Sequence, residues 1–216
     1  MRVRAALTLL LFCMNAAVAA PFAVQVGEAR LALDAPAGFS DVQGTGSPRL
    51  LELAESITSP SNRILLFALD DADVRRFGVG DPVELRRYAI VVTPKGLERD
   101  RVTPAAFQSF VGDSLRELGS PPQHADPKRH LDQQPAGRAG LLAELRREPQ
   151  VVSVLQGARV SAKERRYLLS TTTLMLIRGK AVNLAVYTLY DRDADLEWIR
   201  AATARWVDDL QRLNSR

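Results

Sequence analysis

Residues 151–190 constrain the fold most, because they hold three β-type segments in succession with no helical segment between them. The segments 151–160 and 167–177 are rich in β-branched and apolar residues and are separated by a charged turn at 162–165. Arg178-Gly179-Lys180 then separates the second segment from the third, 181–190. The pattern predicts an antiparallel meander, and the charged residues beside Gly179 argue against a membrane span.

Other periodic segments predict a hairpin, two further strands and three helices. Alternation predicts a hairpin over 22–33, and short apolar runs at 64–69 and 88–92 are typical of buried strands. Helical spacing predicts helices over 48–57, from Thr103 to Gly119, and from Asp193 or Asp195 onward, with a helical turn near 70–76. Two apolar stripes are expected to pack in the core: Phe107, Phe110, Val111, Leu115 and Leu118 on the central helix, and Leu196, Ile199, Trp206, Val207, Leu210 and Leu213 on the last helix.

The segment 120–140 interrupts this pattern with four prolines and both histidines of the chain. We expect a loop or mobile insertion there, followed by a helical turn over 141–147. The strands mostly follow one another without helical crossovers. The sequence therefore predicts one α+β domain over residues 20–216, with a mainly antiparallel sheet covered by amphipathic helices.

The order of these elements resembles the PsbP-like fold, which includes photosystem II extrinsic subunits, a Ran-binding transport protein and exported bacterial proteins of unknown role. The resemblance rests on the hairpin leading into Ala35-Pro36-Ala37-Gly38-Phe39, on the strand at 64–69, and on the closing meander and helix. It implies a layered α+β arrangement and a binding or assembly role. It carries over no site residue.

The first nineteen residues have the features of a cleavable export signal. Arg2 and Arg4 precede an apolar stretch at 5–16, and Ala17-Val18-Ala19 matches the small-x-small cleavage pattern, so we expect the cut after Ala19. The apolar stretch is shorter than the roughly 20 residues that span a bilayer. A periplasmic location in a Gram-negative bacterium follows as an expectation, with no transmembrane segment after signal removal.

Cleavage would remove Cys13, the single cysteine, and two of the 29 basic side chains. The remaining 27 basic and 25 acidic side chains give a formal net charge of +2, and basic pairs are spread along the chain. Disulfides and thiol chemistry are thereby excluded from the processed chain, and nucleic acid is not an expected partner.

Three acidic positions, Asp191, Asp193 and Asp195, share the spacing that begins a calcium loop. Leu196 stands where that loop needs glycine, and Ala202 stands where it needs glutamate, so we interpret the acids as a helix start. The same interpretation applies to the acids at 70–73. His124, Asp126, His130 and Asp132 offer metal-ligand types, but we favour solvated loop side chains over a metal site.

No catalytic motif stands out elsewhere. Gly-x-Ser-x-Gly is absent, Gly78-Val79-Gly80 runs into Asp81-Pro82 rather than forming a phosphate loop, and the hydroxyls at 170–173 fit cross-strand pairing. We predict no catalytic, cofactor-binding or metal residues and no cofactor. The leading hypothesis is an exported, noncatalytic module that binds a protein or another envelope component through an open sheet face or the 120–140 segment, helped by Trp198 and Trp206. The alternatives are a periplasmic hydrolase using dispersed carboxylates or a metal at 124–132, and a carrier of a small apolar ligand.

Overall fold

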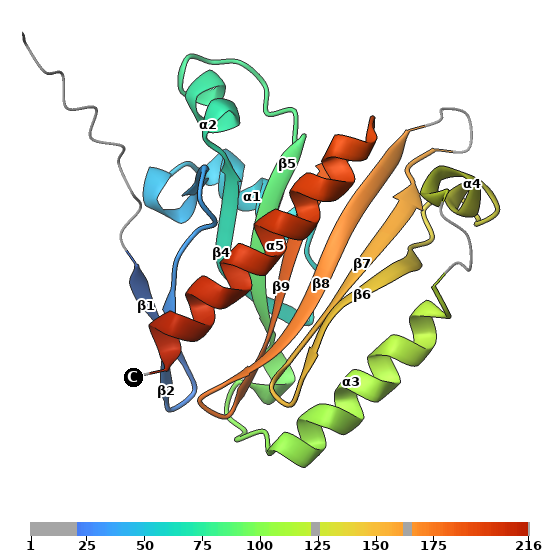
Figure 1. The fold of residues 1–216 in the computed structure, drawn as a ribbon. Coiled ribbons are helices and arrows are strands. Elements are labelled where there is room, and N and C mark those ends of the chain that lie inside the picture. The colour runs from blue at the N-terminus through green and yellow to red at the C-terminus, as the bar shows by residue number, and fades with distance from the viewer. Residues whose placement is uncertain (1–20, 122–125, 162–165, 216) are drawn as a thin grey trace, which may run out of the picture.

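The computed structural model describes residues 21–121, 126–161 and 166–215. Within them, seven antiparallel strands form the main sheet in the order β3-β4-β5-β9-β8-β7-β6, and β1 and β2 form a separate hairpin (Figure 1). The strands are β1 (Phe22–Val26), β2 (Ala29–Leu33), β3 (Phe39–Asp41), β4 (Asn62–Asp70), β5 (Arg87–Pro94), β6 (Gly140–Glu148), β7 (Val151–Arg159), β8 (Tyr167–Ile177) and β9 (Lys180–Leu189). The helices are α1 (Pro48–Ser56), α2 (Asp71–Gly78), α3 (Pro104–Leu118), α4 (Pro127–Asp132) and α5 (Asp193–Asn214). The predicted α+β class with a mainly antiparallel sheet is confirmed.

The predicted meander is confirmed as β7, β8 and β9. Val151 pairs with Met175, and Ile177 pairs with Lys180 at the tip of the β8–β9 hairpin. The two turn residues, Arg178 and Gly179, have φ angles of 52° and 78°. Positive φ at both central residues is the signature of a type I′ turn, whose twist matches that of the strands it joins.

The prediction of a helical turn at 141–147 is wrong, because these residues belong to strand β6. Register shifts between Leu141 and Ala143, and between Glu144 and Arg146, mark two β-bulges against β7. Each bulge resets the alternation of side chains, so the period-2 pattern that indicates a strand is lost from the sequence.

The described part of the 120–140 segment is not only loop, because it contains the short helix α4. Leu131 of α4 is fully buried, and a Cβ added at Gly157 of β7 would lie 2.7 Å from Leu131 Cδ1. Glycine at position 157 therefore lets α4 pack directly on the strand. The predicted mobility of the segment stays a prediction.

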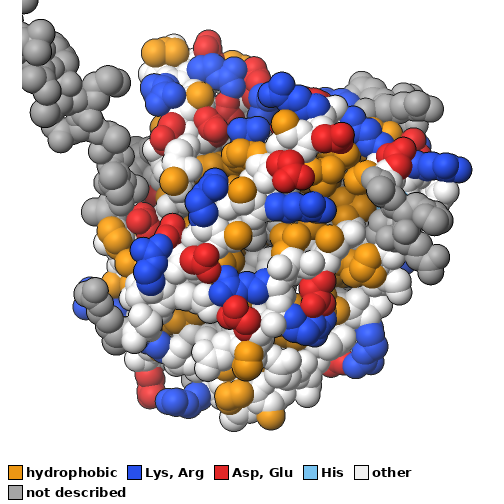
Figure 2. All heavy atoms as spheres, viewed as in Figure 1, with side chains coloured by type: hydrophobic (Ala, Val, Ile, Leu, Met, Phe, Trp, Pro, Cys, Tyr) orange, Lys and Arg blue, Asp and Glu red, His pale blue; other side chains and the backbone are white. Residues whose placement is uncertain are grey.

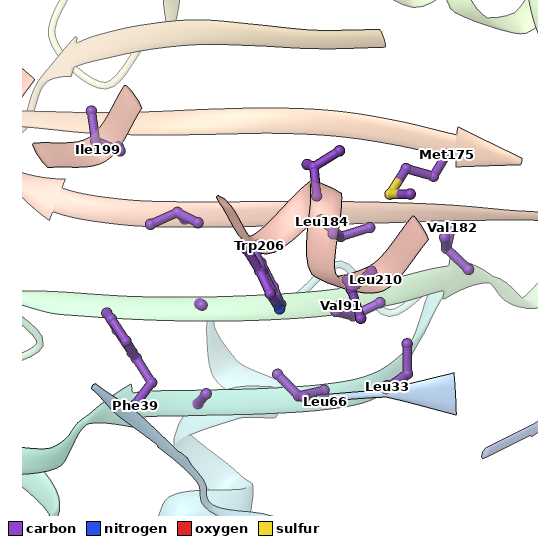
Figure 3. Packing of buried hydrophobic residues seen from close by; sticks show 14 of the residues in the cluster. Leu33, Phe39, Leu66, Val91, Met175, Val182, Leu184, Ile199, Trp206 and Leu210 are labelled. Atoms are coloured by element: carbon purple, nitrogen blue, oxygen red, sulfur yellow. The ribbon is translucent and has the colours of Figure 1, made fainter. Parts of the chain in front are cut away.

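Helix α5 crosses one face of the main sheet, with the β1–β2 hairpin near its C-terminal end (Figure 1). Its predicted stripe is buried from Leu196 to Leu210, and Trp206 Nε1 donates a hydrogen bond to the carbonyl oxygen of Asp34 at 2.8 Å (Figure 3). Asn214 bonds to both backbone groups of Ala32 and so fastens the hairpin to the helix. Lysine and arginine side chains alternate with acidic ones across this face (Figure 2).

Helices α1 and α3 cover the opposite face of the sheet. Side chains of successive strand residues point to opposite faces, so neighbouring residues of one strand belong to different cores. Leu66 and Val91 belong to the core under α5, whereas Phe67 and Ile90 belong to the core under α1. Phe107 and Val111 of α3 pack against Val152, Leu174 and Leu176. None of the helices in the described ranges is long and apolar enough to cross a membrane.

Candidate functional site

Of the four candidate metal ligands at 124–132, the structure describes Asp126, His130 and Asp132. His124 lies outside the described residues. Asp126 accepts a hydrogen bond from the Arg129 amide at 3.1 Å as the cap of α4, and Asp132 accepts one from the Tyr167 hydroxyl at 2.7 Å. Within the described ranges, no three His, Cys, Asp or Glu side chains are placed to hold a metal ion.

The acids at 191–195 lie at the start of α5, as predicted, but neither Asp193 nor Asp195 is the N-cap: that residue is Arg192, and Asp195 is the third residue of the helix. Asp195 Oδ2 accepts hydrogen bonds from the amides of Asp191 and Arg192 at 3.1 and 3.0 Å. Burial alone would raise the pKa of Asp195, but these amides and the Arg87 guanidinium lower it, and its net pKa lies below the usual value. Asp195 is therefore held as a carboxylate at neutral pH.

A charged pocket of about 390 Å³ lies between α2, the first residues of β5, the end of β9 and the start of α5. Four aspartates and four arginines line it: Asp70, Asp73, Asp191, Asp195, Arg76, Arg86, Arg87 and Arg192. This is a convergence of acids of the kind that a hydrolase would need.

Each aspartate of the charged pocket already has a structural partner. Asp70 caps α2 through the Ala72 amide at 2.8 Å, and Asp73 pairs with Arg76. Asp191 pairs with Arg86 at 3.0 Å and Asp195 with Arg87 at 3.4 Å. General acid catalysis needs a carboxyl with a raised pKa, and the pKa of Asp195 is lowered, so Asp195 is unsuited to that role.

The interface between α3 and the sheet is filled by the side chains of the predicted stripe. Phe107 and Val111 are buried there. A pocket of about 520 Å³ with polar lining from Arg101, Thr103 and Gln150 lies beside the first turn of α3 rather than under the stripe. An apolar cavity of about 360 Å³ remains beside the first turns of α3, lined mainly by Leu97, Val102, Phe107, Phe110 and Ala181. The core-packing interpretation of this stripe is supported for Phe107 and Val111, whereas Phe110 is exposed.

Two of the hydroxyls at 170–173, those of Thr172 and Thr173, pair across the sheet as predicted, and that of Thr171 bonds to a helix instead. Thr173 and Ser153 share a hydrogen bond of 2.7 Å across β7 and β8, and Gln156 donates to Thr172 at 3.0 Å. Thr171 bonds to Thr203 of α5 at 2.9 Å. These contacts occupy the hydroxyls without any nucleophilic chemistry.

The outer edge of β4 is open over its first half. Strand β3 pairs only Phe39–Asp41 with 68–70 of β4, and Val42 then donates its amide to the carbonyl oxygen of Phe67 at 2.8 Å. The chain turns away there into a short 3-10 helix, Gln43–Thr45. As a result, residues 62–66 are paired with β5 on one side and with no described strand on the other, although the Arg63 side chain donates a hydrogen bond to the carbonyl oxygen of Gln25 in β1 at 3.1 Å.

A groove of about 600 Å³ runs beside this open edge, and we call it the β4–α1 groove. Ile64 and Phe67 of β4 and Leu51, Ala54 and Glu55 of α1 line its sides, and Pro60 and Lys95 lie at the end where α1 turns into β4. Polar residues complete the lining: Gln43, Thr58, Ser59, Asn62 and Arg63. The combination is an unpaired strand edge next to a helix side that presents both apolar and polar groups. It is the feature of the molecule best shaped to receive another chain.

Two cations lie in this groove. Arg63 forms an ion pair with Glu98, with Nη1 and Oε2 3.2 Å apart. Lys95 Nζ donates to the Pro60 carbonyl oxygen at 2.8 Å and has no acidic partner among the described residues. The positive charge of Lys95 is therefore available to a ligand.

No family model and no curated protein matches the chain. The solved structures that it resembles include two at 12% identity. The Ran-binding protein Mog1p of Saccharomyces cerevisiae matches with a TM-score of 0.37 over 92% of this chain and 94% of its own, and a variant of protein Mog1 matches with 0.39 over 91% and 94%. The suggested kinship with exported bacterial PsbP-like proteins is thus corrected, because the structural matches are Mog1 proteins and no family model supports it. At these scores the likeness carries no argument about function.

The sequence pattern does not reveal the β4–α1 groove. The strand at 64–69 is predicted as buried on both faces, which is right, but burial of its faces says nothing about its edges. The glycines at 44 and 46 signal a turn after Phe39–Asp41, and they are the one sequence feature that indicates how short β3 is. The predicted contribution of Trp206 to binding does not fit its burial, whereas Trp198 is half-buried beside Phe39 and Arg87.

Proposed function

We propose that this chain is a noncatalytic binding module that receives a peptide segment of a protein partner in the β4–α1 groove. The observation that carries the proposal is the unpaired first half of β4 beside the apolar side of α1. Concave sites with an apolar lining and a few polar groups are the usual form of binding sites in proteins. Each aspartate of the charged pocket has a capping or ion-pair contact, while Oδ2 of the buried Asp73 has no hydrogen-bond partner, and these contacts support a binding role over a hydrolytic one.

We further propose that the module works in the bacterial cell envelope. The support for this part is the pattern of the first nineteen residues, with its short positive start, apolar stretch and cleavage motif ending at Ala19. Expression of the full chain in a Gram-negative host, followed by fractionation and N-terminal sequencing, tests it. A periplasmic product that begins at Ala20 is the expected result, and an uncleaved cytoplasmic product would contradict it.

The binding role is tested by selecting peptides from a random phage-displayed dodecapeptide library on the purified protein. Leu51→Glu puts a charge into the groove wall and is expected to weaken the selected peptides at least tenfold, because roughly 1–2 kcal/mol of apolar contact is lost. Ile57→Glu is the matched control, since Leu51 and Ile57 are 40% and 42% exposed but only Leu51 lines the groove. Equal loss or equal retention of binding in the two variants would contradict the proposed site.

A further inference from the structure

The open half of β4 has the dimensions of a docking place for one short strand. It comprises residues 62–66, and at about 3.3 Å per residue this edge is about 17 Å long, enough for a peptide of five residues. Strand β3 pairs antiparallel with residues 68–70 on this side of β4 and then leaves the sheet. Residues 62–66 are the part of the same side that β3 does not reach. A strand placed there would extend an existing antiparallel ladder rather than begin a new one.

We propose that the peptide partner binds as an added strand on β4, antiparallel to it and in line with β3. This inference rests on the proposed function and specifies how the ligand is recognised. In strand addition, main-chain hydrogen bonds supply affinity, and pockets for alternate side chains supply specificity. The β4–α1 groove provides such a pocket on one face of the added strand only, where Leu51 and Ile64 lie.

The lining of the groove defines the side-chain chemistry of the ligand. Alternate residues of an added strand point to the same face, so every second residue that faces α1 should be apolar. Lys95 lies at the Pro60 end with no acidic partner among the described residues, whereas Glu55 lines the neighbouring wall. A single aspartate or glutamate next to Lys95, with apolar residues on the α1 side, is the complementary sequence.

The bulge in β4 is consistent with this use. The register between β4 and β5 shifts between Ile64 and Leu66, which leaves Leu65 without a partner residue in β5. Bulges strengthen the local twist of a strand and redirect its backbone groups. Leu65 is therefore the one residue of 62–66 without a counterpart in β5, while Ile64 and Leu66 on either side of it remain paired.

The decisive experiment is an N-methyl scan of a peptide selected as described above. In an antiparallel strand only every second amide points toward the neighbouring strand. Methylation of one alternate set of peptide amides should weaken binding at least tenfold, and methylation of the other set should change it less than about threefold. Amide hydrogen exchange of the complex should slow within 62–66 of β4 and remain unchanged in β6.

A second arm tests the charge complementarity. Lys95→Glu should weaken a selected peptide with an acidic residue about tenfold, and Arg49→Glu, an exposed charge reversal on α1 outside the groove, should leave its affinity unchanged. Replacing the acidic residue of the peptide by glutamine should remove the difference between wild type and Lys95→Glu.

The outcomes separate this inference from the proposed function. Peptides that lose binding in Leu51→Glu but tolerate both methylation sets would overturn strand addition and leave the groove as the binding site. Peptides that do not distinguish Leu51→Glu from Ile57→Glu would overturn both. Dimerisation of the protein through β4, abolished by Leu51→Glu and without peptide binding, would identify a second copy as the occupant and overturn the peptide assignment.

Discussion

At one edge of the main sheet, β6 presents nine residues of which four are charged, and at the other, β3 covers only the last three residues of β4. Both edges lie in the same sheet, but the β6 edge has more of the features that hinder pairing with another chain. It has two bulges, and Glu144, Arg146, Arg147 and Glu148 stand along it, whereas the open half of β4 has one bulge and one charged residue, Arg63. Natural proteins use bulges and charges to close edge strands. The difference supports the proposed binding of a peptide at the β4 edge rather than at the β6 edge.

The charged side chains of the two edges also differ in the number of partners that they bind. Arg146 of β6 donates to Glu148 at 2.7 Å, to Asp208 of α5 at 2.6 Å and to Gln211 of α5 at 3.0 Å. This network fastens the edge strand to the helix that crosses the sheet. On the open half of β4, Arg63 has one carboxylate partner, Glu98, and α1 contacts the strand through apolar side chains. Arg63 also donates to the carbonyl oxygen of Gln25 in β1 at 3.1 Å. The closed edge is therefore tied to the helix that crosses the sheet, whereas the open edge is tied to the β1–β2 hairpin and to Glu98 and is packed against α1.

The largest expected effect at the closed edge comes from removing the anchor of α4. Leu131→Ala should lower the free energy of unfolding by about 2–5 kcal/mol, because a fully buried leucine over Gly157 is replaced by a cavity. Urea unfolding followed by circular dichroism measures the loss. Leu51→Ala, at the open edge, is the control and should cost less than about 1 kcal/mol, since that side chain is 40% exposed. Similar losses in both variants would contradict the difference between the edges.

A smaller effect is expected from cutting the network that joins β6 to α5. Arg146→Ala removes hydrogen bonds to three side chains from a guanidinium that is 26% exposed, and should cost about 1–2 kcal/mol. Arg147→Ala removes a pair with Glu144 from a more exposed side chain and should cost at most about 0.5 kcal/mol. Denaturant titrations of both variants check the order. An Arg147→Ala loss as large as that of Arg146→Ala would show that the link to α5 does not hold the edge.

The sequence predicts this fold well where its signals are local. The hairpin at 22–33, the strands at 64–69 and 88–92, the meander and the stripe of α5 all follow from periodicity and turn residues, which act within a few positions. Strand β6 is missed because bulges against β7 break its period, and a bulge is set by the partner strand rather than by β6 alone. Strand β3 is missed because three residues are too few to show a period.

The candidate site is harder to predict for a physical reason. The groove depends on which strands are neighbours, on where β3 stops, and on α1 lying next to β4, all of which are relations between distant residues. The interpretation of the acids at 70–73 and 191–195 as helix starts needs only the next few residues, and Asp70 and Asp195 have the hydrogen bonds expected of it. Acidic residues at a helix start can therefore be predicted from the sequence, whereas an open sheet edge cannot.

The smallest expected effect is a pH response of opposite sign at the two edges. At β6, hydrogen bonds from Arg147 and Arg146 lower the pKa of Glu144 and Glu148, respectively, below their usual 4.5. Their contribution to stability is present above pH 4.5 and is lost as the pH falls through the lowered values. At β3, burial raises the pKa of Asp41 above 3.8 despite hydrogen bonds from the backbone of Gln43 and Phe67, so its contribution is greatest below pH 3.8 and declines as the pH rises through the raised value.

Carboxyl titration by NMR tests this sign difference directly. Glu144 and Glu148 should titrate below 4.5, and Asp41 should titrate above 3.8. Amide exchange corrected for its intrinsic pH dependence should show β6 opening more readily relative to β3 as the pH falls from 6 toward 3, and Asp41→Asn should remove the β3 part of the change. A parallel response of both edges would mean that the ion pairs along β6 contribute nothing to its closure, and that the bulges and the packing of α4 alone keep that edge from pairing.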